Sequence, residues 1–415
     1  MNTNRRFFLK QSSSLLGCLF SISNLNNQTQ RASKSILLRS SWQTINIGDI
    51  GHTPGVLALI EKYLPEFEVR LWAGDIKNGV EEMLIKRFPN VPIIKSSDKD
   101  ALELAFKECD FLLHGSGPYL VATQDITKWY NETRKPFGIY GITLNEDRAT
   151  PDAISMMNKS QFIFFRDSFS LEYCKKIGIN CPIMEFGPDC AFGVDLKNDD
   201  ASKKFMHNNG LKEGGFLCVI PRYRFVPNWK IPSKNATINK DKNDRNELMK
   251  EHDHKPLREA IIAVIRQTNL KILICPEDVT QVELGKKILY DPLPEDVKKR
   301  VVWRSTYWLT DEALSTYTRS VGLFGNEMHS PIMCIGNGIP AIVCRFHEQT
   351  SKGIMWKDIG LGEWLFDLDV EKEIDGIVPA VLEMAKNPKL AKKKALKARD
   401  LVNKYQQKNI SNIKK

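Results

Sequence analysis

The sequence NEMHSPIMCIGNGIPAIVCRF, residues 326–346, decides the fold of this chain. An apolar strand over residues 321–324 precedes it. A helix is predicted to begin near Ser330-Pro331, because proline suits the first turn of a helix. The helix ends at the Gly-Asn-Gly of residues 336–338, and a buried strand follows over 339–344. The polar residues that open the stretch therefore lie between a strand end and a helix start, where open α/β sheets bind anions and place catalytic groups.

Strands and helices alternate in the same way through the rest of the chain. This rhythm is typical of parallel α/β architecture, and we expect two Rossmann-like domains facing each other across a cleft. The predicted strands cover residues 35–38, 67–72, 91–95, 111–114, 137–142 and 162–165, with the segment 183–190 completing the first domain, and residues 216–220, 272–275, 301–303, 321–324 and 339–344 in the second. A polar turn over 46–52 is predicted to precede a helix over 56–63.

The length of 415 residues suits two domains better than one. We predict a signal or disordered segment over 1–34, an N-terminal domain over 35–195, a C-terminal domain over 196–385 and a basic helix over 386–415. The second domain holds the donor site, and its polar stretch 227–255 is predicted to be a long surface insertion.

The positive charge is concentrated at the two ends of the chain. The formal net charge is +10, with +5 in residues 1–34 and +10 in residues 386–415, which leaves −5 for the remainder. No basic patch is interleaved with aromatic residues, so nucleic-acid binding is not expected. The basic C-terminal helix leaves peripheral contact with a membrane open, and the oligomeric state is not determined by the sequence.

The first residues are similar to a twin-arginine export signal. Arg5 and Arg6 precede Phe8, Leu9 and Lys10, and a short apolar run follows that could not span a bilayer. We therefore expect export to the periplasm, with a cytoplasmic protein that carries a disordered basic N-terminus as the alternative. A lipoprotein-like context around Cys18 is the lesser alternative.

The nine cysteines and seven histidines form no zinc-type spacing, so we expect no metal site and no cofactor. Three cysteines, at positions 174, 181 and 190, are close enough in sequence for one disulfide in an exported protein. His252-Asp253-His254 lies in the polar stretch and is interpreted as solvated loop. His52 and His114, at predicted strand ends, are interpreted as structural.

Several motifs together resemble the polysaccharide pyruvyl transferase family, whose members have two Rossmann-like domains of the GT-B glycosyltransferase type. The resemblance covers most of residues 36–385. Its motifs are Asn46, Gly48 and Asp49; Gly115-Ser116-Gly117; Arg166, Asp167 and Ser170 with Lys175-Lys176-Ile177-Gly178-Ile179 and Pro188-Asp189-Cys190-Ala191-Phe192; and His329, Gly338 and Pro340 with Lys352 downstream.

The resemblance implies transfer of a pyruvyl unit from phosphoenolpyruvate to two hydroxyls of a polysaccharide or oligosaccharide, which gives a ketal and releases phosphate. His329 titrates near neutrality and is the predicted acid–base group, with Glu327 beside it. Asp167 is predicted to cap the helix that follows it. The predicted donor- and substrate-binding residues are Asn46, Gly48, Asp49, Gly115, Gly117, Arg166, Arg222, Ser330, Arg345 and Lys352, and Tyr119, Tyr223, Trp303, Trp308 and Trp356 are candidate walls for the acceptor.

One position departs from the family pattern. The family usually has Arg-x-His where this chain has Glu327-Met328-His329, and a glutamate would repel an anionic donor. Arg345, at the end of the next strand, or Arg222 and Arg224 across the cleft, are candidates to restore the positive charge. Export is a second conflict, because phosphoenolpyruvate is cytosolic.

Three functions therefore stand open at this stage. The first is a pyruvyl transferase-like enzyme that acts on a cell-surface polysaccharide. The second is a diverged GT-B-type transferase with another donor, in which Glu327 is a general base or binds a sugar hydroxyl. The third is an exported glycan-binding protein without catalysis.

Overall fold

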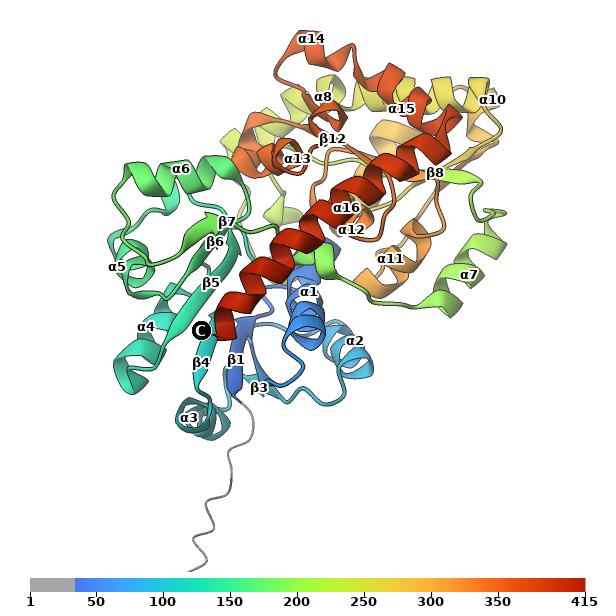
Figure 1. Ribbon diagram of the computed structural model, residues 1–415. Helices are drawn as coiled ribbons and strands as arrows, with labels where there is room; N and C mark the ends of the chain where they lie inside the picture. Colours follow the sequence, from blue (N-terminus) through green and yellow to red (C-terminus); the bar gives the residue numbers. More distant parts are fainter. Residues whose placement is uncertain (1–33, 415) are drawn as a thin grey trace, which may run out of the picture. The chain divides into compact units, whose positions relative to one another are not determined.

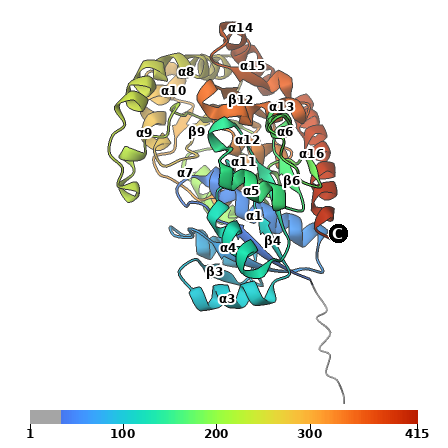
Figure 2. The same ribbon diagram turned by 90° about the vertical axis from the view of Figure 1, so that its left-hand side faces the viewer.

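The computed structural model describes residues 34–414, which hold two parallel sheets (Figures 1 and 2). The first sheet has the order β3-β2-β1-β4-β5-β6-β7 and the second the order β10-β9-β8-β11-β12-β13. Every strand pair in both sheets is parallel. Each order steps outward to one edge and then restarts beside the first strand, as in a Rossmann fold. The predicted fold of two Rossmann-like sheets is confirmed.

The strands form where the sequence has continuous apolar runs, because parallel strands are covered by helices on both faces. The first sheet comprises β1 (Ser35–Ser40), β2 (Glu68–Ala73), β3 (Ile93–Lys95), β4 (Phe111–His114), β5 (Phe137–Ile142), β6 (Ile163–Phe165) and β7 (Met184–Phe186). The second comprises β8 (Phe216–Ile220), β9 (Lys271–Ile274), β10 (Val301–Trp303), β11 (Gly322–Gly325), β12 (Ala341–Arg345) and β13 (Leu365–Asp367). All strands of the first sheet lie within 35–195 and all strands of the second within 196–385. The domain limits themselves stay predictions, since residues 33–415 form one compact unit.

Helices connect successive strands in both halves. They are α1 (Ile47–Tyr63), α2 (Val80–Arg87), α3 (Lys99–Glu108), α4 (Thr123–Thr133), α5 (Pro151–Lys159), α6 (Ser168–Lys176), α7 (Asp199–Asn208), α8 (Lys240–Gln267), α9 (Gln281–Leu284) with the π-helical turn η5 (Gly285–Tyr290), α10 (Glu295–Lys298), α11 (Thr310–Tyr317), α12 (His329–Gly336), α13 (Met355–Asp358), α14 (Glu371–Ile374), α15 (Ile377–Lys386) and α16 (Pro388–Ser411). Among the described residues, no helix is both long and apolar enough to cross a membrane.

Helix α1 begins nine residues before the predicted helix over 56–63, so the prediction of a turn over 46–52 is wrong. Asn46 caps the helix, since its Oδ1 accepts hydrogen bonds from the backbone N–H of Gly48 (2.8 Å) and Asp49 (3.0 Å). The glycines that suggested a turn are needed for close packing instead. A Cβ on Gly48 would lie 2.2 Å from the Cβ of His329, and a Cβ on Gly55 would lie 2.1 Å from the carbonyl oxygen of Cys190.

The polar stretch 227–255 is not a surface insertion throughout, which corrects a second prediction. Its latter part forms the first half of α8, and Asp253 and His254, expected in a solvated loop, are buried. Asp253 accepts two hydrogen bonds from the buried Arg224 guanidinium, at 2.8 and 2.9 Å. The same guanidinium pairs with Glu348 and Asp369. The charged face of α8 is buried here because its Asp253 carboxylate pairs with the buried Arg224 guanidinium.

The predicted C-terminal helix is α16, which packs on both halves of the molecule (Figure 1). It contacts α1 and the 3₁₀ turn η2 (Cys190–Gly193) of the first half, and α12 and α15 of the second. Its lysines face outward, while Ala391, Ala395, Ala398, Val402 and Ile410 are buried. One cluster of buried apolar side chains thus runs from β1 and α1 through the second sheet to α16.

Each of the eight described cysteines is a buried free thiol. The disulfide left open among Cys174, Cys181 and Cys190 is therefore not formed in this structure. The twin-arginine-like residues and Cys18 lie outside the described residues.

We predict that Arg224→Met will lower the free energy of unfolding by about 3–5 kcal/mol, because it leaves Asp253 buried without its cation. Urea-induced unfolding followed by circular dichroism measures the change. Arg245→Met is the matched control, since Arg245 also pairs with Glu348 but its side chain is 39% exposed. It should cost less than about 1 kcal/mol. Equal losses for the two variants would contradict the structural role assigned to Arg224.

Candidate active site

A cavity of about 560 Å³ lies at the carboxyl ends of strands from both sheets. Ligands of doubly wound sheets bind at these ends, beside the point where the strand order reverses. That point lies between β8 and β11 in the second sheet, and the residues that follow these strands are Arg222 and Glu327. The lining includes Asn46, Asp49, Tyr119, Thr143, Arg148, Arg166, Arg222, Lys234, Asp278, Glu327, His329, Gln349 and Lys352.

His329 is the first residue of α12, and its side chain is only 6% exposed. Its Nδ1 lies 3.6 Å from Asp49 Oδ1 and 3.4 Å from Glu277 Oε1, and its ring meets the His52 ring edge-on with centroids 4.8 Å apart. Burial, and then the charge of Lys352, hold the pKa of His329 well below its ordinary value. The imidazole is therefore neutral at physiological pH and available as a base.

Lys352 brings its amine to the same ring. Its Nζ lies 2.7 Å from Nε2 and 3.2 Å from Nδ1 of His329. Burial, followed by the nearby Arg166 guanidinium, lowers the pKa of Lys352 to about 8, although Asp49 and Glu277 oppose the shift. A lysine with such a pKa exchanges protons readily near neutral pH, so the pair supplies both a proton donor and an acceptor.

Glu327 does not stand alone in the cavity. Its Oε2 accepts a hydrogen bond from Arg222 Nη1 at 2.7 Å, and its Oε1 accepts one from Gln281 Nε2 at 2.5 Å. Burial raises the pKa of Glu327 to about 7, against the lowering effect of Arg222. Burial likewise raises the pKa of Asp278 to about 6. Arg222, a predicted candidate to offset the negative charge of Glu327, thus forms a direct ion pair with it.

Arg166 lines the cavity but is tied to the first half. Its Nη1 pairs with Asp189 Oδ2 at 2.7 Å, and its Nε donates to Thr143 Oγ1 at 2.7 Å. Asp189 also lies 3.0 Å from His52 Nδ1. Burial raises the pKa of Asp189, but His52 and Arg166 outweigh this effect and hold it well below its ordinary value. Asp167 caps α6 as predicted, through a 2.7 Å bond from the N–H of Ser170.

Five predicted binding residues lie outside the cavity lining, of which Gly48 is described below. Ser330 was expected to offer its N–H to an anion, but that N–H donates to Glu277 Oε2 at 2.6 Å, so a carboxylate already occupies the helix start. Gly115 and Gly117 pack against Ser40 and Trp42 instead. Arg345 pairs with Asp367 and donates to the carbonyl of Thr350.

The family motif at the start of α1 lies near His329, and its three residues Asn46, Gly48 and Asp49 have different roles. Asn46 and Asp49 line the cavity, whereas Gly48 gives His329 room to approach α1. Asp49 supplies a carboxylate to the cavity, and its side chain is 20% exposed. Burial alone would raise the pKa of Asp49, but His329 and His52 outweigh burial and lower it.

The aromatic candidates for the acceptor wall differ in whether they line a cavity, and His114 lines neither cavity. Tyr119 lines the cavity and Trp308 lines a neighbouring one, whereas Tyr223, Trp303 and Trp356 line neither. His114 is buried and stacks on Trp42, with ring centroids 5.0 Å apart. Burial lowers the pKa of His114 to about 3, which fits a structural role.

Sequence reasoning missed four charged residues at the site. Glu277 and Asp278 follow β9 directly, and Arg148 lies in the 3₁₀ turn η1 (Glu146–Arg148) shortly after β5. The rule that parallel strand ends converge could have found these three. Lys234 lies in η4 (Pro232–Lys234), within the stretch taken for a surface insertion, and nothing in the sequence marks it.

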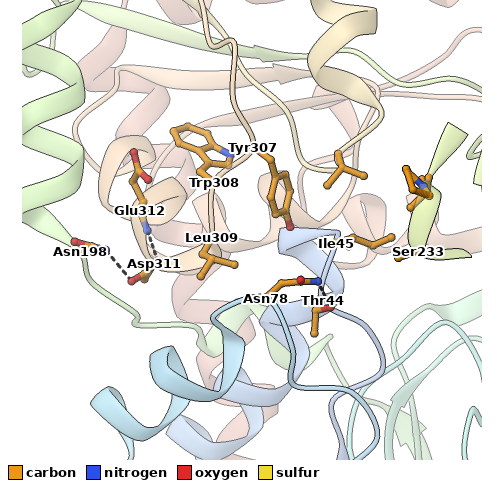
Figure 3. Close-up of a pocket in the computed structure, with 13 residues that line it drawn as sticks. Thr44, Ile45, Asn78, Asn198, Ser233, Tyr307, Trp308, Leu309, Asp311 and Glu312 are labelled. Carbon is orange, nitrogen blue, oxygen red and sulfur yellow. Dashed lines mark hydrogen bonds between the residues drawn. The ribbon is translucent and has the colours of Figure 1, made fainter.

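A second cavity of about 740 Å³ adjoins the first, and Ile45 and Ile231 line both. Figure 3 shows Tyr307 and Trp308 in its wall, with Asn78 and Thr44 below the tyrosine and Asn198 and Asp311 at the far side. The hydroxyl of Tyr307 is buried without a hydrogen-bond partner among the described residues. The wall thus mixes apolar faces with amide and carboxylate groups.

The sequence profile of the polysaccharide pyruvyl transferase family matches residues 46–348, which include the strand-end residues of the cavity. The chain belongs to this family. The match identifies the family as one of transferases. It covers β2 to β12, and so parts of both sheets, and it ends before Lys352. No curated protein matches the chain in sequence.

Solved structures of similar fold support the same architecture. The UDP-GlcNAc 2-epimerase from Neisseria meningitidis, bound to UDP-GlcNAc, is 10% identical with a TM-score of 0.56, over 91% of this chain and 99% of that one. The Anabaena protein HepE, in complex with UDP and glucose, is 9% identical with a TM-score of 0.56, over 92% and 99%. The UDP-GlcNAc 2-epimerase from Methanocaldococcus jannaschii is 13% identical with a TM-score of 0.54, over 85% and 92%. At these identities the similarity shows the fold alone.

The raised pKa of Glu327 predicts a specific pH dependence of stability. The folded state holds this proton more tightly than the unfolded chain, where the pKa is near 4.5. The stabilisation of the folded state by the proton on Glu327 is therefore complete below pH 4.5 and is lost as the pH rises through about 7. Glu327→Gln cannot ionise, so its unfolding free energy should fall less over this interval, by roughly 1–3 kcal/mol.

Denaturant unfolding at a series of pH values measures this difference in slope. Glu103→Gln is the control, because Glu103 is exposed on α3 and its replacement should leave the wild-type slope. Parallel curves for wild type and Glu327→Gln would show that Glu327 is ionised throughout.

Proposed function

We propose that this protein transfers a pyruvyl group from phosphoenolpyruvate to two hydroxyls of a glycan, with release of phosphate. The observation that carries the proposal is the neutral His329 in contact with Lys352, in a cavity that also holds Arg166 and Arg222, on a chain of the pyruvyl transferase family. Together they offer acid–base groups beside a binding site for an anion.

Cations of the lining can hold the donor despite Glu327. Arg148, Lys234 and Lys352 have no carboxylate partner among the described residues, while Arg166 and Arg222 each have one. Arg148 lies over the Tyr119 ring, 4.1 Å from its centroid, which holds the guanidinium at the cavity wall. A carboxylate and a phosphate on one small donor need several such groups, through charge-assisted hydrogen bonds.

The His329–Lys352 pair suits the proton transfers. The enol carbon of the donor takes a proton, and the first sugar hydroxyl adds to the adjacent carbon as it loses its own proton. The second hydroxyl then adds to the same carbon and passes its proton to the departing phosphate as the carbon–oxygen bond to phosphate breaks, which completes the ketal. Lys352 is the proposed proton donor to carbon, and His329 the proposed acceptor from a hydroxyl, since a base near neutrality must be unprotonated at the start.

The neighbouring cavity is the proposed acceptor site. It shares the lining residues Ile45 and Ile231 with the donor cavity, and its Tyr307 offers an aromatic face on which a sugar ring can pack. Asn78, Asn198 and Asp311 offer hydrogen-bonding groups for hydroxyls. At about 740 Å³ the cavity holds more than one sugar unit.

The buried Glu327 favours one alternative, a transferase of the same fold with a different donor. Two of the structures of similar fold contain UDP or a UDP-sugar, so a nucleotide sugar is the donor to test. Export through the proposed twin-arginine-type signal would also separate the enzyme from cytosolic phosphoenolpyruvate. Cell fractionation of the mature protein therefore bears on the donor directly.

We predict that the purified protein will release phosphate from phosphoenolpyruvate when a suitable glycan is present. His329→Ala should lower kcat/KM at least about 100-fold, because the acid–base group is removed. Arg148→Ala should instead raise the KM for phosphoenolpyruvate with less effect on kcat, because it only binds the donor. A coupled phosphate assay over a panel of glycans measures both.

The matched control is His207→Ala, since His207 is exposed on α7 and lines neither cavity; its activity should equal wild type. Hydrolysis or transfer with UDP-sugars but not with phosphoenolpyruvate would support the alternative donor. Activity that survives in His329→Ala would remove the proposed mechanism.

A further inference from the structure

Four side chains with metal-binding atoms lie at or behind the wall of the donor cavity, and two of them, Asp49 and His329, line it. Asp49 and His52 come from α1, and Glu277 and His329 come from the ends of β9 and β11. Asp49 Oδ1 lies 3.8 Å from His52 Nε2 and 3.6 Å from His329 Nδ1, and His329 Nδ1 lies 3.4 Å from Glu277 Oε1. The ligand atoms of Asp49, His52 and His329 are all within 4.8 Å of one another.

The spacing suits a small cation. A tetrahedral ion with bonds of about 2.0–2.1 Å separates its ligand atoms by roughly 3.3–3.4 Å. The three measured separations exceed this by a few tenths of an ångström, which small side-chain rotations can close. Direct hydrogen bonds, by contrast, would need shorter and better aligned contacts.

His52 is held in the tautomer that a metal ligand requires. Its Nδ1 lies 2.6 Å from Ser116 Oγ and 3.0 Å from Asp189 Oδ1. Ser116 Oγ donates its own proton to Asp189 at 3.2 Å and a carboxylate can only accept, so Nδ1 carries the proton. Nε2 is buried and has no hydrogen-bond partner among the described residues. It faces the Asp49 carboxylate at 3.8 Å, an arrangement that a proton or a metal ion on Nε2 would stabilise. A carboxylate behind a ligating histidine is the usual outer partner at metal sites.

Glu277 presents a buried carboxylate oxygen to His329, next to this group. Its Oε2 accepts the N–H of Ser330, whereas its Oε1 is buried without a hydrogen bond and lies 3.4 Å from His329 Nδ1. Gly48 keeps the surrounding space open, because a Cβ there would lie 2.7 Å from Glu277 Oε1. Glu277 thus adds negative charge beside the proposed ligands.

We propose that Asp49, His52 and His329 bind one first-row divalent metal ion such as Zn²⁺. Two imidazoles with one carboxylate favour Zn²⁺ or its neighbours in the row over Mg²⁺ and Ca²⁺, which prefer oxygen ligands alone. Asp49 and His329 line the cavity, so the ion would be reached from there. The ion would also join the two halves, because the first half supplies two ligands and the second half supplies one.

Lys352 is the competing cation at this site, since its Nζ lies 2.7 Å from Nε2 and 3.2 Å from Nδ1 of His329. A neutral imidazole has a single lone pair, so an ammonium group and a metal ion cannot both be bound by it. Removal of the amine should therefore tighten metal binding. This expectation separates a metal site from a cluster that Lys352 alone neutralises.

The test is Zn²⁺ titration of the full chain, free of any polyhistidine tag, by calorimetry and by competition with a chelating dye. Wild type should bind one equivalent. Asp49→Asn and His52→Gln should each weaken binding at least tenfold, and Lys352→Met should bind at least as tightly as wild type. His207→Gln, which removes an exposed histidine on α7, should change nothing. Co²⁺ in place of Zn²⁺ should give the intense visible absorption of a four-coordinate site in wild type and not in His52→Gln.

Absence of stoichiometric Zn²⁺ binding in both wild type and Lys352→Met would overturn the proposal. So would Zn²⁺ affinity unchanged in Asp49→Asn and His52→Gln, which would place the ion elsewhere. Circular dichroism shows whether each variant is folded. If His52→Gln does not fold, Asp49→Asn alone decides the test. These measurements contain no donor, so their failure leaves the proposed pyruvyl transfer standing, and failure of the transfer leaves the metal site standing. A bound ion would take the lone pair by which His329 accepts a proton, so the two proposals describe the metal-bound and the metal-free protein.

Discussion

The approach of α1 to α12 is the constraint on which the rest of the structure depends. At Gly48 the backbone of the first half comes so close to His329 that no side chain fits between them. This contact places Asp49 and His52, in the first turns of α1, against a histidine from the other sheet. It also sets the N-terminus of α1 against the segment after β9, where the N–H of Ile47 donates to the carbonyl of Glu277. The site exists because two helix starts, one from each sheet, meet there.

The burial that follows from this contact governs the charge states at the site. Solvent is excluded from Glu327, Glu277 and Lys352, so each is pushed towards its neutral form, and the remaining charges pair locally. Arg222 and Glu327 follow β8 and β11, which are neighbours in the sheet, so their pairing follows from the strand order itself. The glutamate that breaks the family pattern is therefore accommodated by a neighbour that the topology provides.

Much of the fold could be predicted, because buried parallel strands leave continuous apolar runs in the sequence; β4, β5, β8 and β10 have the predicted limits. The position of His329 at the start of a helix followed from the strand, the proline and the glycines around it. The start of α1 could not be predicted, because local preference at Gly48 opposes a helix and only packing against the other sheet favours it. Glu277 was missed for a similar reason: its hydrogen-bond partner Ser330 is 53 residues away in the sequence.

The position of α16 has a consequence for how the protein is made. Its side chains complete the first half of the chain: Gln406 donates to the carbonyl of Asp189 and Tyr405 packs on Phe186. Just beyond α16, the carbonyl of Lys414 accepts a hydrogen bond from Lys34, 380 residues away. These contacts form only once α16 has left the ribosome. The N-terminal sheet must therefore wait, partly uncovered, through the synthesis of the entire second half, and its exposed apolar surface is where chaperones would bind during that interval.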